Sequence, residues 1–110
     1  VSRGLGDVYK RQHKENIRNK ISTALNAGVP VFISECSICD ASGNGGIDYA
    51  SASEWLDFMN SNQLSFIAWS LSNKAETSAL ISSGCSAKSG WSDGDLSETG
   101  RWFKSAISGR

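Results

Sequence analysis

Two apolar runs constrain the fold of this chain most strongly, Val29 to Glu35 and Leu64 to Trp69. Each is nearly continuous in apolar residues, which is typical of parallel strands that are covered on both faces. The first run ends in a carboxylate and leads directly into the Gly- and Asp-rich loop 40–46, whereas the second ends in an indole. Because parallel α/β proteins keep their chemistry at the carboxyl ends of their strands, these two strand ends predict a site.

Helical patterns alternate with these strands. Apolar residues recur at helical spacing from Lys14, and Gly28 marks the end of that helix. Asp48 is expected to cap a second helix, and Asp95 with Glu98 predicts a capping box before a third. The order helix, strand, helix, strand, helix predicts parallel βα units. The side chains expected to face the core are Tyr49, Ala52, Trp55, Leu56 and Met59 on the second helix, and Trp102, Phe103, Ala106 and Ile107 on the third.

The length of the chain limits what two strands can build. A closed barrel of eight βα units takes about 250 residues, and this chain has 110. It is therefore either a small open α/β domain or part of a larger fold, and two buried strands that need neighbours on both edges favour the second. Residues 1–12 show neither the helical nor the strand periodicity of apolar residues, and they resemble translated adaptor sequence. We expect them to be a non-native or unassigned leader, and residues 13–110 to form the barrel part.

Charge and side-chain chemistry point to a neutral partner. Lys+Arg and Asp+Glu number 11 each. The chain therefore has no net positive charge whose field would attract nucleic acid or an anionic membrane. No apolar run approaches the roughly 20 residues that cross a bilayer. The strand ends and the segment after them offer Glu35, Trp69, Lys74 and Glu76. Indoles pack on the C–H faces of sugars and charged groups hydrogen-bond their hydroxyls, so this set suits a carbohydrate, with no cofactor expected.

The cysteines allow two other hypotheses. The chain has three cysteines, Cys36, Cys39 and Cys85, which are too few for a disulfide framework. Because their number is odd, at least one is unpaired within the chain. Cys36 and Cys39 form a CxxC, but a redox CxxC begins a helix that lowers the thiol pKa, and here a loop follows. With Cys85 and His13 the pair could complete a Cys3His zinc site. A single CxxC does not specify zinc, so no metal is predicted.

Three motifs in this order and at this separation resemble family 5 glycoside hydrolases, the cellulase family, and bacterial endo-β-1,4-glucanases in particular. They are Pro30–Glu35, Asp40–Gly46 and Trp69–Ser78, and the resemblance runs from about His13 to the C-terminus. It implies an α/β fold, the C-terminal portion of a (β/α)8 TIM barrel, comprising the last two βα units and the preceding helix. It further implies a retaining glycosidase acting on β-glucan such as cellulose, secreted, and monomeric when intact.

The same resemblance implies roles for individual residues. Glu35 matches the nucleophile, and Trp69 matches the aromatic platform under the sugar on the non-reducing side of the cut. The other matches are to substrate-contacting positions, namely Lys74, Glu76, Ala41 and His13. The general acid/base of the family lies in an Asn-Glu-Pro, which this chain lacks. We therefore expect a fragment that carries the nucleophile of an endoglucanase. The alternative is a small non-catalytic α/β module that binds carbohydrate or metal.

Overall fold

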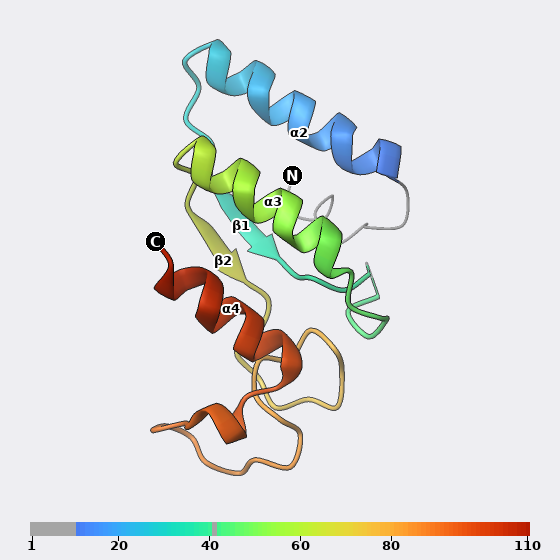
Figure 1. Cartoon of the computed structure of the whole chain (residues 1–110), viewed down its shortest axis with the longest axis vertical. Coiled ribbons are helices and arrows are strands. Elements are labelled where there is room, and N and C mark those ends of the chain that lie inside the picture. Colours follow the sequence, from blue (N-terminus) through green and yellow to red (C-terminus); the bar gives the residue numbers. More distant parts are fainter. Residues whose placement is uncertain (1–10, 41) are drawn as a thin grey trace.

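The computed structural model describes residues 11–40 and 42–110, and for residues 11–14 only the backbone. The elements in chain order are α2 (Arg11–Asn26), β1 (Ile33–Cys36), α3 (Tyr49–Ser61), β2 (Phe66–Ala68), the short 3-10 helix η1 (Asp93–Asp95) and α4 (Glu98–Ser108) (Figure 1). This alternation confirms the predicted order. The expected leader lies outside the described residues, except for the first two positions of α2. No helix in the described ranges is long and apolar enough to span a membrane.

The two strands pair in parallel, as predicted, so that their carboxyl ends lie at the same end of the sheet, where the long loops gather (Figure 1). Both strands are shorter than the apolar runs predict. Val29 cannot begin a strand because its N–H donates to the carbonyl of Ala24 at 2.9 Å. The N–H of Gly28 donates to Leu25 at 3.0 Å, and Gly28 has a φ of 78°. These bonds form a Schellman motif that ends α2, and they confirm the predicted role of Gly28.

The caps of the later helices are partly as predicted. Asp48 caps α3 by accepting a hydrogen bond from the N–H of Ser51 at 3.0 Å, which confirms the expectation. The predicted capping box of Asp95 with Glu98 is wrong. Asp95 instead accepts from the N–H of Ser92 at 2.8 Å and so closes η1. Because that carboxylate is engaged, Ser97 caps α4, where its hydroxyl oxygen accepts from the N–H of Gly100 at 3.0 Å.

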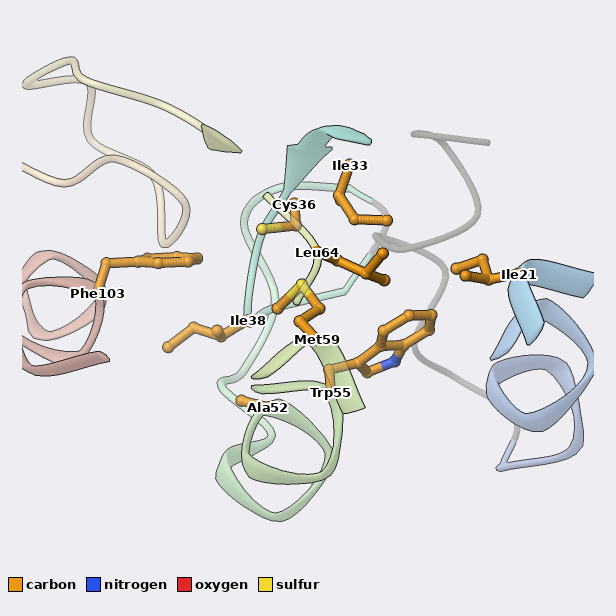
Figure 2. Close-up of a cluster of buried hydrophobic side chains, with 9 residues drawn as sticks. All are labelled: Ile21, Ile33, Cys36, Ile38, Ala52, Trp55, Met59, Leu64 and Phe103. Carbon is orange, nitrogen blue, oxygen red and sulfur yellow. The ribbon is translucent and has the colours of Figure 1, made fainter. Parts of the chain in front are cut away.

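The core lies between the sheet and the helices. Figure 2 shows Trp55 and Met59 of α3 beneath the strands. Ile21 of α2 lies on one side of them and Phe103 of α4 on the other. The buried cluster comprises Ile21, Ile33, Cys36, Ile38, Ala52, Trp55, Met59, Leu64 and Phe103. Leu56 and Trp102 are partly buried against it and Ala106 is buried, as predicted.

Two residues expected in the core are exposed, Tyr49 and Ile107. Tyr49 is the first residue of α3, and its hydroxyl donates to the carboxylate of Glu98 at the surface. A tyrosine can remain at the surface when a carboxylate there accepts a hydrogen bond from its hydroxyl. Ile107 lies in the last turn of α4 and is 58% exposed.

The first turn of α4 is docked on the chain that leaves the strand-end loops. The N–H of Ser97 donates to the carbonyl of Leu80 at 3.0 Å, and its hydroxyl donates to the carbonyl of Ala79. Gly100 lies so close that an added Cβ would come within 2.0 Å of the Leu80 oxygen. This contact requires glycine at position 100 for space rather than for backbone conformation.

Gly100→Ala should therefore destabilise the chain although alanine is the better helix former. In an open helix the change would gain roughly 0.5–1 kcal/mol, whereas overpacking against backbone costs about 1–3 kcal/mol. Urea unfolding followed by circular dichroism measures the difference in the free energy of unfolding. Gly94→Ala is the matched control, because its Cβ would meet only the Ser92 hydroxyl at 3.7 Å. A Gly100→Ala chain as stable as the unsubstituted one contradicts this account of the α4 contact.

Candidate functional site

The ends of the two strands are joined by a backbone hydrogen bond. The N–H of Trp69 donates to the carbonyl of Cys36 at 2.8 Å. Glu35, one residue earlier in β1, is half-buried, and the Trp69 side chain is 49% exposed directly after β2. The structure thus places the predicted carboxylate and indole at the same end of adjoining parallel strands, where both remain accessible.

A β-bulge explains why Glu35 is accessible within a strand that faces the core. From the pair Ile33–Phe66 to the pair Cys36–Ala68, β1 advances by three residues and β2 by two. In a regular strand an odd spacing would put Ile33 and Cys36 on opposite faces, but both are buried in the core. The bulge takes up the extra residue and leaves Glu35 half-exposed. Bulges commonly re-aim a side chain in this way beside functional sites.

The loops that follow the two strands are bonded to each other. The carbonyl of Gly43 accepts from the N–H of Ser78 at 2.9 Å, and Asn44 Oδ1 accepts from the N–H of Thr77 at 3.2 Å. Gly43 has a φ of 78°, and a Cβ there would come within 3.2 Å of the Ser78 hydroxyl. Loop 40–46 thereby holds the segment that carries the remaining candidates.

Loop 40–46 also has an internal support. Asp40 Oδ1 accepts from the N–H of Ser42 at 2.8 Å. The Asp40 carboxylate fills the space beside Gly45, where a Cβ would lie 1.5 Å from Oδ2. Asp40, Gly43 and Gly45 are therefore structural: they shape the turn that presents Asn44.

Lys74 and Glu76 lie together in one open groove of about 410 Å³. Lys74 is exposed and Glu76 is half-buried. The other residues that line the groove are Asn44, Ala75, Ile81, Ser82, Ser83 and Ser97. An ammonium, a carboxylate and several hydroxyls can donate to and accept from a neutral polyhydroxylated ligand. Glu35 and Trp69 are not among the residues lining this groove, so the described residues do not bring all four candidates into one pocket.

Two predicted substrate contacts fall outside the described side chains. Ala41 lies in the gap between the described ranges. His13 is in the first turns of α2, and only its backbone is described. Their roles stay predictions. Asn44, in contrast, has no signal in the sequence beyond that of a turn residue. Its hydrogen bond with Thr77, 33 residues later in the sequence, is seen only in the folded structure.

The CxxC belongs to the core rather than to a reactive site. Burial raises the pKa of the Cys36 thiol to about 12, and burial is also the main cause that raises the pKa of Cys39. The Ser37 hydroxyl lies 3.1 Å from Cys39 Sγ. A redox-active thiol needs the opposite shift, toward a lower pKa. Within the described part of the chain, no three His, Cys, Asp or Glu side chains gather into a possible metal site.

The match to a known family extends over most of the chain. The family model described as "Cellulase (glycosyl hydrolase family 5)" matches residues 5–75. This chain belongs to glycosyl hydrolase family 5. The match confirms the resemblance that the three motifs indicate. It begins within residues 1–12, whose assignment as a leader stays a prediction.

Curated relatives carry endoglucanase names. An endoglucanase of Clostridium saccharobutylicum is 40% identical over 101 residues, which cover 92% of this chain and 22% of the relative. Endoglucanase N of Pectobacterium atrosepticum is 36% identical over 99 residues, covering 90% of this chain and 22% of the relative. The chain thus spans about a fifth of the length of these relatives.

Solved structures show the fold family to which the described elements belong. A GH5 cellulase from an Icelandic hot spring isolate superposes with a TM-score of 0.83 at 36% identity, over 97% of this chain and 34% of that one. Endoglucanase Cel5A of Thermobifida fusca, solved with cellotetraose, superposes with a TM-score of 0.77 at 19% identity, over 94% of this chain and 32% of that one, and supports the fold alone. The family fold is a (β/α)8 barrel, and this chain matches about a third of these structures.

The buried CxxC generates a labelling prediction. In the folded chain at pH 8, iodoacetamide should modify Cys85, which is half-buried, while Cys36 and Cys39 stay unmodified. With a pKa of about 12, only about one Cys36 thiol in 10⁴ is ionised at this pH, and the thiolate is the species that reacts. Mass spectrometry of tryptic peptides measures the three rates, with the urea-unfolded chain as control. Equal rates in the folded chain would contradict the placement of the CxxC in the core.

Proposed function

We propose that this chain is the section of a retaining endo-β-1,4-glucanase that carries the nucleophile, and that the whole enzyme hydrolyses cellulose or a related β-glucan. The observation that carries the proposal is the hydrogen bond between Trp69 and Cys36, which joins the strand ends that present Glu35 and the indole. Family membership and the endoglucanase names of the relatives support the substrate class.

Glu35 is assigned the nucleophilic step. In a retaining glycosidase one carboxylate attacks the anomeric carbon and forms a glycosyl-enzyme, while a second carboxyl group about 5–5.5 Å away protonates the leaving oxygen and then activates water. The position of Glu35 in the paired strand β1 supports the first role, because a carboxylate on a paired strand is held more rigidly than one on a loop. The chain contains no Asn-Glu-Pro, so the acid/base is assigned to another part of the whole enzyme.

The accessible side chains beside Glu35 are assigned to sugar binding. The half-exposed indole of Trp69 offers a face for the C–H groups of a glucosyl ring. Lys74 and Glu76, in their shared groove, donate to and accept from hydroxyls of sugars farther from the cut. The backbone of Ala41 and the side chain of His13 are assigned to the same cleft. Because the substrate is a polymer, we assign the whole enzyme to the outside of the cell, as a monomer without a cofactor.

A graft tests the role of Glu35. In the C. saccharobutylicum endoglucanase, this chain replaces the matching section of 101 residues, and hydrolysis of carboxymethylcellulose is measured. The grafted enzyme should be active, and Glu35→Gln should lower its turnover by about 10⁶-fold, the scale on which removing the nucleophile acts in a serine protease.

Glu54→Gln is the matched control for this graft, because Glu54 is an exposed carboxylate on α3 that pairs with Arg18 at 3.6 Å. It should leave turnover within about twofold of the unsubstituted graft, since Glu54 is far from the strand ends in sequence and its own side chain is 55% exposed. A folded graft that keeps its activity after Glu35→Gln contradicts the proposal. A folded graft without activity supports the non-catalytic binding module instead.

The isolated 110-residue chain should show no turnover of soluble glucan. It presents a nucleophile without the second carboxyl group that the reaction needs. A reducing-sugar assay on the purified chain measures this, with the grafted enzyme as the positive control. Turnover that co-purifies with the chain and disappears in Glu35→Gln would mean that the acid/base lies within these residues.

A further inference from the structure

The peptide groups on either side of Thr77 are held from two directions. Its N–H donates to Asn44 Oδ1 at 3.2 Å. Its carbonyl accepts from the hydroxyl of Thr99 at 2.6 Å. Asn44 is an exposed residue of loop 40–46, whereas Thr99 is buried in the first turn of α4. Two segments that follow different strands thus meet at one residue.

Thr77 directly follows Glu76, so fixing its backbone fixes where the Glu76 side chain begins. The N–H of Glu76 donates to the carbonyl of Lys74 at 2.8 Å, and its own carbonyl accepts from Ala79 at 3.2 Å. The segment 74–79 is therefore a tight turn. Asn44 lies on the groove side of this turn and lines the same groove as Lys74 and Glu76.

We propose that Asn44 is a positioning residue: by holding the N–H of Thr77 against the anchor that Thr99 provides, it sets the place of the Glu76 carboxylate in the groove. This rests on the proposed function for the contact between Glu76 and a sugar hydroxyl. Asn44 acts on the ligand through Glu76 and not by a bond of its own. The side-chain oxygen carries the effect, so aspartate, which keeps that oxygen, should replace it and alanine should not.

Amide hydrogen exchange on the full 110-residue chain tests the geometry. Asn44→Ala should speed exchange of the Thr77 N–H by about 5–10-fold, the factor that one hydrogen bond of ordinary net strength represents. Asn44→Asp should restore the slow exchange. Asn60→Ala, at an exposed asparagine on α3, is the matched control and should leave Thr77 unchanged. A Thr77 amide that is unprotected in the unsubstituted chain, or unaffected by Asn44→Ala, overturns the proposal.

A double-mutant cycle with cellotetraose tests whether Asn44 acts through Glu76. Calorimetric titration should show that Asn44→Ala weakens binding about 5-fold when Glu76 is present and less than twofold when Glu76 is replaced by alanine. Asn44→Asp should bind within about twofold of the unsubstituted chain. Equal weakening with and without Glu76 overturns the positioning role, because Asn44 would then contact the sugar itself or support the fold in general.

The two arms separate this inference from the proposed function. An unsubstituted chain that does not bind cellotetraose contradicts the sugar-binding role of Lys74 and Glu76. The exchange of the Thr77 N–H then decides alone whether Asn44 fixes the turn. A chain that binds cellotetraose with no coupling between Asn44 and Glu76 supports the proposed function and overturns the positioning role.

Discussion

The parallel pairing of β1 and β2 is the constraint on which the site depends. In an antiparallel pair the ends of the two strands would lie at opposite edges, and Glu35 could not adjoin Trp69. The ladder itself is short, four residues against three, and a two-stranded sheet is marginal by itself. The stabilisation comes from the helices that pack on one face through Trp55, Met59 and Phe103. The strand ends that carry Glu35 and Trp69 are therefore positioned by the packing of this core.

The two faces of the sheet differ in what covers them. Phe66 and Ala68 pack against the helical core, whereas Phe32 and Ile67 stay about half exposed, at 52% and 55%. In a (β/α)8 barrel, side chains on the second face fill the barrel interior in layers. This explains why both runs are apolar at consecutive positions: alternate residues serve two different cores. The bulge at Glu35 interrupts that alternation and leaves the carboxylate half-exposed.

The sequence predicts the features that depend on local pattern. The order of elements, the stop at Gly28 and the cap at Asp48 follow from periods and single side chains, and the structure confirms them. Features decided by tertiary contact are not predictable in this way. Ser97 caps α4 because Asp95 is engaged elsewhere. The bulge, and contacts between residues far apart in sequence, leave no local period, so the strand-end residues could be named from sequence but not the bonds that hold them.

The segment after β2 has little regular secondary structure, yet its backbone is extensively paired. Ser70 donates its N–H to the carbonyl of Ser78 at 3.0 Å and accepts from Leu80 at 3.0 Å, and Ile81 forms an antiparallel bridge with Leu96. Hydrogen-bonded backbone groups order a loop even where it has no regular secondary structure. Lys74 and Glu76 therefore lie on a segment whose backbone is already ordered. In the proposed sugar-binding role, less conformational entropy would be lost when the ligand binds. An irregular segment can thus be preorganised, and here the order comes from β1, β2 and α4 together.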